Sequence, residues 1–270
     1  MIVSSMTGVE TGLRKRPFCA VLLAEVDLLP LGPGCARFAR MKGDVLLALA
    51  LTLAGGLGVA FWPAVDLATA SLFAVPGEGF PLAQNPMLIV LHQTASRGAW
   101  ILGVGLVGAA AFAGVRARPL GGLSARGWLF LVCALLVGPG LVVNVGLKDH
   151  WGRARPSQIV EFGGTRSFSP ALEPHESKVP NGSFVAGDPA VGFAFVSLAF
   201  LVASAWRRRI FWGGVALGGV LGLMRIAMGG HFLSDVLFSG FVVILTSAVL
   251  ARIFFPASFA PSFLSRSPHA

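Results

Sequence analysis

Residues 222–235 read GLMRIAMGGHFLSD, a polar seam between two strongly apolar segments that meet at a Gly229-Gly230 pair. Three ionisable side chains lie in this seam: Arg225, His231 and Asp235. Ionisable groups so close to membrane-buried chain are costly and usually functional. If a helix begins near His231, Asp235 lies on the same face four residues later and can orient the imidazole as a nucleophile or base. The alternative is that all three are helix-end residues whose polar ends reach the membrane surface.

The composition is that of an integral membrane protein. Of the 270 residues, 55% are hydrophobic and only 12% are charged, and the mean hydropathy is +0.77. Soluble domains carry about 25% charged residues. The three cysteines, Cys19, Cys35 and Cys133, form no disulfide framework. We see no cluster of metal-ligating residues in the sequence, and we expect neither a metal nor another cofactor.

Six apolar segments predict an all-α, polytopic helix bundle with six transmembrane spans. About 20 helical residues cross the ~30 Å hydrocarbon core of a bilayer, and the second segment is short by this measure. One outer loop, residues 63–99, contains an amphipathic stretch at 87–94 that we expect to lie flat at the interface. The segments are residues 45–62, 100–115, 128–147, 189–206, 210–227 and 232–255.

The distribution of basic residues predicts the orientation. In a six-span arrangement, most of the 21 Lys and Arg residues fall on the side that carries both chain ends. Cytoplasmic loops carry such an excess, so both termini are expected in the cytoplasm. The net charge of +9 is then a topology signal and argues against a nucleic-acid partner. We predict a six-span domain at 41–256, a cytoplasmic tail at 257–270, and a cytoplasmic extension or misassigned start at 1–40.

The second outer loop opens with a pair of cations. Lys148 and Arg155 stand seven residues apart, near one helical face, and Pro156 ends that regularity. With Arg225 from the seam, they could surround a tetrahedral anion. A guanidinium matches two phosphate oxygens, and an ammonium adds a point charge. The alternative is that the cations reach lipid headgroups.

The same loop closes with an acidic helix start. Residues 181–189 read NGSFVAGDP, and Asp188 followed by proline predicts a helix with Asp188 as its N-cap. The exposed amide of Gly187 would then favour an anion. Asp188 could also protonate a leaving oxygen, provided that its pKa rises toward the working pH. If Asp188 is only a cap, His175 or Glu176 is the next candidate acid.

Together these stretches resemble the phosphatidic acid phosphatase type 2 superfamily of membrane lipid phosphatases. The superfamily motif K-x6-RP matches residues 148–156 in full. The motif SR-x5-H-x3-D matches Arg225, His231 and Asp235 in residue type and spacing, with Met224 where serine is usual.

The remaining superfamily motif, PSGH, is degenerate here, because residues 185–188 read VAGD and keep only the glycine. The resemblance covers residues 45–255. Within the superfamily, the Gly-Gly-His-Phe-Leu-Ser-Asp run and the outer loop with Phe73 and residues 79–81 are similar to the lipid A phosphatase branch. Undecaprenyl diphosphate, phosphatidylglycerophosphate and phosphatidate remain open as substrates.

The resemblance implies metal-independent hydrolysis of a lipid phosphate at the periplasmic face of a bacterial inner membrane. His231 attacks phosphorus and carries a phosphohistidine, and Asp235 orients it. Asp188 replaces the histidine that donates a proton in the superfamily. The alternative is a non-catalytic lipid-phosphate binding or transport protein derived from the same fold. The phosphoryl oxygens are bound by the cations of the two spaced motifs, Lys148, Arg155 and Arg225.

Overall fold

The computed structural model describes residues 35–174, 182–202 and 204–256, all of which belong to one compact unit, Pro33–Ala270. The described chain is helical, and its three isolated β-bridges form no sheet there. The predicted tail at 257–270 and nearly all of the predicted extension lie outside the described residues. In chain order the elements are α2 (Cys35–Phe61), α3 (Ala64–Ser71), η2 (Pro81–Gln84), α4 (Pro86–Arg116), α5 (Ala125–Leu135), η3 (Leu136–Lys148), α6 (Asp149–Trp151), η4 (Pro156–Gln158), η5 (Val160–Phe162), α7 (Gly187–Ala194), η6 (Phe195–Phe200), α8 (Ser204–Ala227) and α9 (Leu233–Phe254).

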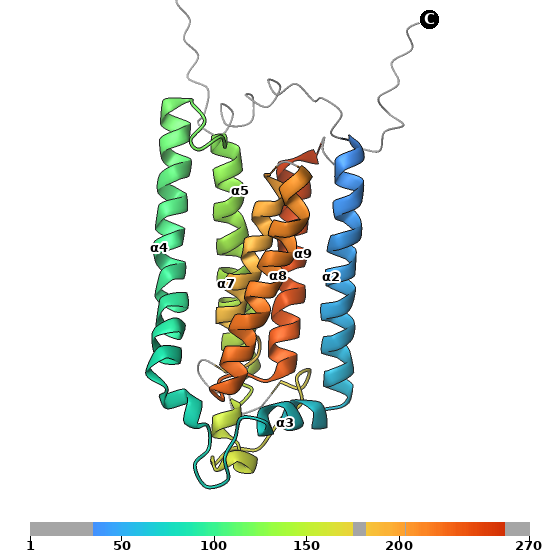
Figure 1. Cartoon of the computed structure of the whole chain (residues 1–270), viewed down its shortest axis with the longest axis vertical. Coiled ribbons are helices and arrows are strands. Elements are labelled where there is room, and N and C mark those ends of the chain that lie inside the picture. The colour runs from blue at the N-terminus through green and yellow to red at the C-terminus, as the bar shows by residue number, and fades with distance from the viewer. Residues whose placement is uncertain (1–34, 175–181, 203, 257–270) are drawn as a thin grey trace, which may run out of the picture. The chain divides into compact units, whose positions relative to one another are not determined.

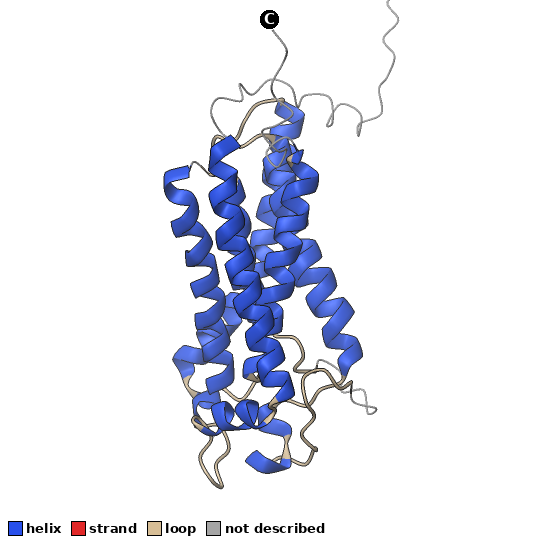
Figure 2. Cartoon of the chain, turned by 90° about the vertical axis from the view of Figure 1, so that its right-hand side faces the viewer, coloured by secondary structure: helices blue, strands red, loops and turns tan. Residues whose placement is uncertain are grey.

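The predicted all-α membrane bundle is confirmed. Five helices are long and apolar enough to cross a bilayer, and Gly187–Phe200, made of α7 and η6, is a shorter apolar sixth. Figure 1 shows these helices side by side, with α3 lying across one end of them. α2 begins and α9 ends at the opposite end, as an even number of crossings requires. Figure 2 shows the short helices and the longer loops gathered at the α3 end.

The second crossing helix corrects a prediction made from the sequence. α4 begins at Pro86 and runs for 31 residues, so the stretch 87–94 belongs to it and does not lie flat at the interface. The Asn85 side chain accepts hydrogen bonds from the amides of Met87 and Leu88, which together with the proline makes a strong helix start. At 1.5 Å per residue α4 is about 46 Å long, more than the ~30 Å core of a bilayer. Its first turns therefore reach the level of α3 (Figure 1).

The third crossing helix changes its pitch half-way. α5 continues as η3, whose wider turns have the hydrogen-bond pattern of a π-helix and contain Pro139. The Pro139 carbonyl accepts a hydrogen bond from the Asn144 side chain at 2.7 Å. π-Helical turns are rare, and they occur frequently at functional sites. Because η3 ends at Lys148, the altered pitch sets the direction in which Lys148 leaves the helix.

Three glycines at four-residue intervals on α8, Gly214, Gly218 and Gly222, allow neighbouring helices to approach closely. An added β-carbon on Gly218 would lie 2.4 Å from the Phe193 ring of α7, and one on Gly222 would lie 2.3 Å from Val236 of α9. Small residues bring membrane helices together in this way, because lipid offers no hydrophobic drive for their association. The starts of α7 and α9 are therefore held beside the end of α8.

Candidate active site

The ionisable residues singled out from the sequence stand at helix ends. α8 carries Arg225 in its last turn, and α7 and α9 carry Asp188 and Asp235 in their first turns. Lys148 is the last residue of η3. These four helix ends meet at the α3 end of the bundle (Figure 1).

The Gly229-Gly230 turn brings Arg225 and His231 together. Gly229 has a left-handed backbone conformation (φ 64°), and the Gly230 amide donates to the Arg225 carbonyl at 2.8 Å. Helices commonly end in this way. An added β-carbon on Gly230 would lie 2.5 Å from Nη2 of Arg225. The turn therefore reverses the chain, and the absence of a side chain at Gly230 leaves room for the guanidinium.

His231 is buried, with 2% of its side chain exposed. Its Nδ1 lies 2.7 Å from the backbone carbonyl oxygen of Ser183. A carbonyl only accepts, so Nδ1 carries the hydrogen and Nε2 keeps its lone pair. Burial lowers the pKa of His231 from its ordinary value, the charges of Arg225 and Lys148 act in the same direction, and Asp235 opposes them. The ring is therefore neutral at neutral pH, as a nucleophile requires.

The Asp235 carboxylate lies closer to the Phe232 amide and to Arg153 than it does to His231. Its Oδ2 accepts a hydrogen bond from the Phe232 amide at 2.8 Å but lies 3.8 Å from Nδ1 of His231, beyond hydrogen-bond length. Its Oδ1 accepts from Nη1 of Arg153 at 2.6 Å. The imidazole is thus oriented by the hydrogen bond that its Nδ1–H donates to the Ser183 carbonyl, whereas Asp235 contributes a nearby negative charge.

Arg153 is fully buried and connects α9 to α3. Its Nη1 donates to Oγ of Ser234, its Nη2 to Oδ2 of Asp66, each at 2.8 Å, and its Nε to the Ser169 carbonyl at 2.9 Å. Asp66 also accepts from the Ser234 amide at 2.9 Å. The carboxylates of Asp66 and Asp235 both bind the Arg153 guanidinium and neutralise its charge. Arg153 is therefore not directed at a phosphate.

Neither Arg153 nor Asp66 is predicted from the sequence to belong to the site. Arg153 lies inside the K-x6-RP motif but is not one of its defined positions, so its charge reads only as one of several outer cations. One signal was available for Asp66, which is the sole charged residue between 63 and 77 in an otherwise apolar stretch. A lone acid at membrane level calls for a buried cationic partner.

Asp188 is not the N-cap of α7, contrary to the sequence prediction. The helix begins at Gly187, two residues earlier than predicted, with Ala186 as N-cap, and no side chain caps it. The Asp188 carboxylate instead points toward α4 and α8. Its Oδ1 accepts a hydrogen bond from Ser96 Oγ at 2.8 Å, and its Oδ2 lies 2.7 Å from Nδ1 of His92 and 3.2 Å from Nε of Arg225.

His92 and Ser96 are the other site residues that the sequence does not predict. They stand four residues apart on one face of α4, in a polar stretch near its start. Such a pair is a signal for a polar contact between membrane helices. The contact is not predicted here because residues 87–94 indicate an interfacial segment rather than part of a span.

The three predicted phosphate-binding cations gather around His231. The charges of Lys148 and Arg225 both act on the His231 ring, and the charges of Arg155 and Arg225 act on each other. Gly187 lies against Lys148, because an added β-carbon there would be 3.5 Å from Nζ. Across the described ranges, no group of three His, Cys, Asp or Glu side chains is arranged to hold a metal ion. The fallback acids of the outer loop, His175 and Glu176, lie outside the described residues.

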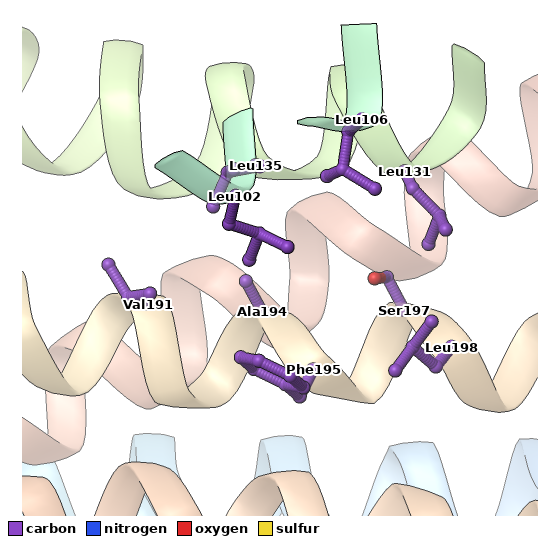
Figure 3. Close-up of a pocket in the computed structure, with 9 residues that line it drawn as sticks. All are labelled: Leu102, Leu106, Leu131, Leu135, Val191, Ala194, Phe195, Ser197 and Leu198. Atoms are coloured by element: carbon purple, nitrogen blue, oxygen red, sulfur yellow. The ribbon is translucent and has the colours of Figure 1, made fainter. Parts of the chain in front are cut away.

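An apolar crevice of about 60 Å³ lies between α4, α5 and the α7–η6 segment (Figure 3). Its volume is well below the roughly 300–1,000 Å³ of ligand pockets. Val191 lines it, one turn along α7 from Asp188, and Ser197 is the one polar residue of its wall. The crevice offers no group for a phosphate, so the chemistry belongs to the polar cluster around His231.

Residues 127–259 match the PAP2 superfamily. This stretch of the chain is a PAP2 superfamily domain. The predicted resemblance is thereby confirmed, and every site residue predicted from the sequence lies inside the matched range. His92 and Asp66 lie outside the PAP2 domain, on α4 and α3.

Three relatives of this chain are named lipid A 4'-phosphatase. The protein of Francisella tularensis subsp. novicida (strain U112) is 43% identical over 127 residues, which are 46% of this chain and 57% of the relative. That of Rhizobium leguminosarum is 39% identical over 120 residues, 44% of this chain and 51% of the relative. That of Rhizobium etli is 43% identical over 104 residues, 38% of this chain and 40% of the relative. The chain thus spans about half the length of these relatives, and no solved structure matches it.

Proposed function

We propose that this protein is an integral-membrane lipid phosphatase that works through a phosphohistidine on His231. The observation that carries the proposal is the setting of that ring, which is buried, lies with Nδ1 2.7 Å from the Ser183 carbonyl oxygen, and is surrounded by cations. A nucleophilic imidazole needs a lone pair on one nitrogen and an orienting partner on the other. A protein that only bound or transported a lipid phosphate would need the cations but not this histidine.

The proposed reaction has two steps. First, Nε2 of His231 attacks phosphorus, the bond from phosphorus to the lipid oxygen breaks, and that oxygen takes a proton. Water then attacks the phosphohistidine, which releases inorganic phosphate and restores the imidazole. Lys148, Arg155 and Arg225 offset the negative charge of the phosphoryl oxygens, which is the positioning and electrostatic role that phosphoryl transfer chiefly requires. Because side chains supply this charge, we propose that turnover needs no metal ion.

The proposed substrate is lipid A or a lipid of similar chemistry. The three relatives bear the name of a lipid A phosphatase, and the polar cluster stands at the end of apolar, membrane-length helices. That placement suits a phosphate on a headgroup whose hydrocarbon chains stay in the bilayer. Undecaprenyl diphosphate and phosphatidylglycerophosphate are the competing substrates.

The decisive experiment measures phosphate release by the purified, detergent-solubilised protein from a panel of these lipids, without added metal and with a chelator present. We expect lipid A to be hydrolysed, and His231→Ala to abolish turnover while the protein still inserts into the membrane. Substantial residual turnover in His231→Ala would exclude this histidine as the nucleophile. Lipid-phosphate binding by the wild-type protein without release of phosphate would establish the binding or transport alternative.

We further propose that the protein lies in a bacterial inner membrane with both termini in the cytoplasm and the site at the periplasmic face. The excess of basic residues near the chain ends supports this orientation. It is tested with single cysteines, in a background without the three native ones, at Thr165 in the second outer loop and at Arg118 between α4 and α5, both exposed. A membrane-impermeant thiol reagent should label intact spheroplasts only at position 165. Labelling at position 118 alone would reverse the topology.

A further inference from the structure

The polar contacts between α4 and α7 converge on one carboxylate. Oδ2 of Asp188 lies 2.7 Å from Nδ1 of His92 and 3.2 Å from Nε of Arg225, while Oδ1 accepts from Ser96 at 2.8 Å. The Asp188 side chain is 13% exposed and that of His92 is 33% exposed. His92 is therefore tied to Asp188 through Nδ1, while part of its ring stays exposed.

These partners make Asp188 a poor proton donor. Both of its oxygens face donors, and one of those donors is the permanently charged Arg225. Hydrogen bonds and cations around a carboxylate favour its ionised form, which can only accept. The lipid oxygen that leaves phosphorus still needs a proton, because an alkoxide is a poor leaving group. We therefore look for the proton donor among the groups that lie next to Asp188.

We propose that His92 is the general acid of the phosphatase reaction and that Asp188 is the carboxylate that positions it. This inference rests on the proposed phosphatase function. In the imidazolium form, Nδ1–H of His92 donates to Asp188 and Nε2–H remains to donate to the leaving oxygen. As the phosphorus–oxygen bond breaks, the proton moves from Nε2 to that oxygen. Neutral His92 then takes a proton from the water that attacks the phosphohistidine, so the protons balance over one turnover.

The contact between His92 and Asp188 accounts for the degenerate PSGH motif. The chain has Asp188 where the resemblance places a histidine, and the structure brings a histidine from a different helix into contact with that aspartate. α4 lies outside the PAP2 domain at 127–259, so no superfamily motif includes His92. Arg225 contacts the same Asp188 oxygen as His92, which places the imidazole next to the cations that surround His231.

A purely structural role is the competing explanation, because a polar contact between membrane helices could simply fasten α4 to α7. Replacing His92 with glutamine separates the two roles. The glutamine amide can still donate to Asp188 but cannot give up a proton to the leaving oxygen. Gln93→Ala, at an exposed neighbour on the same helix, is the matched control.

The test compares a lipid phosphate, whose leaving alkoxide needs a proton, with p-nitrophenyl phosphate, whose leaving group does not. We expect His92→Gln to lower kcat on the lipid by roughly 10²-fold or more, and to affect the aryl substrate much less. Gln93→Ala should match the wild-type protein on both. Added imidazole buffer should restore part of the lipid turnover in His92→Ala, because imidazolium from solution can supply the missing proton.

Three results overturn the assignment. Equal losses on both substrates with no rescue by imidazole would show that His92 only holds α4 in place. A leaving-group dependence that appears in Asp188→Asn but not in His92→Gln would make Asp188 the acid. Wild-type protein that is inactive on both substrates would instead overturn the phosphatase function itself, and the role of His92 with it.

Discussion

Arg153→Lys should destabilise the protein and slow it, although the charge is conserved. The guanidinium makes four hydrogen bonds, to Asp235, Asp66, Ser234 and the Ser169 carbonyl, with nothing exposed to solvent. Lysine presents one compact ammonium and lacks the planar fork. A lysine ammonium can remain paired with one of the two carboxylates, Asp66 or Asp235, but not with both.

The cost follows from the carboxylate that loses its partner. Breaking a buried ion pair by removing one partner costs about 3–5 kcal/mol, because the other charge remains buried. Lysine keeps part of the network, so we take the lower end, about 3 kcal/mol. For a chain of this size, each kcal/mol lowers the melting temperature by about 2–4 °C, which makes a drop of about 6–12 °C. We also expect kcat to fall at least tenfold, because Asp235 sits in the first turn of α9, next to His231.

The assay is thermal unfolding of the detergent-solubilised protein, followed by circular dichroism, together with phosphate release at 25 °C. Arg166→Lys is the matched control, since Arg166 is exposed in the same outer loop and should shift stability by less than about 0.5 kcal/mol. Combining Arg153→Met with Asp66→Asn should cost less than the two single changes added together, because the neutral amide leaves one buried charge fewer. An Arg153→Lys protein that melts within 2 °C of wild type, at full activity, would refute this account of the network.

Two further predictions concern the seam that opens the site. Gly230→Ala should weaken substrate affinity at least tenfold, because the new β-carbon would lie 2.5 Å from Nη2 of Arg225. The control is Gly213→Ala on α8, where an added β-carbon meets nothing within 4 Å and KM should not change; equal KM values in the two variants would contradict the close approach. The pKa of His231, measured by NMR of isotope-labelled histidine and assigned with His231→Gln, should lie below its ordinary value of about 6.5, because burial penalises the imidazolium. The ring then keeps its lone pair to lower pH than a free histidine, and a pKa above 6.5 would mean that Asp235 dominates.

Features confined to one segment could be predicted from the sequence. Length and apolar composition within each run locate all six crossing helices, to within a few residues at most ends. The spacing of Arg225, His231 and Asp235 depends only on one helix end, one turn and one helix start, so local rules describe it. The start of α4 is an exception, because the amphipathic pattern at 87–94 predicts an interfacial segment, whereas the helix that crosses the bundle already begins at Pro86. That error concealed His92 and Ser96.

By itself, the sequence determined the class of the protein, its six apolar segments, and the three cations and the histidine of its candidate site. Only the tertiary structure decided which groups act on one another. Ser183 and His231 are 48 residues apart, Arg153 and Asp66 are 87 apart, and His92 and Asp188 are 96 apart. Period and spacing carry no information on such pairs, because each joins different elements. Their contact depends on how closely α7, α8 and α9 pack through the α8 glycines, and on how far α4 extends toward α3.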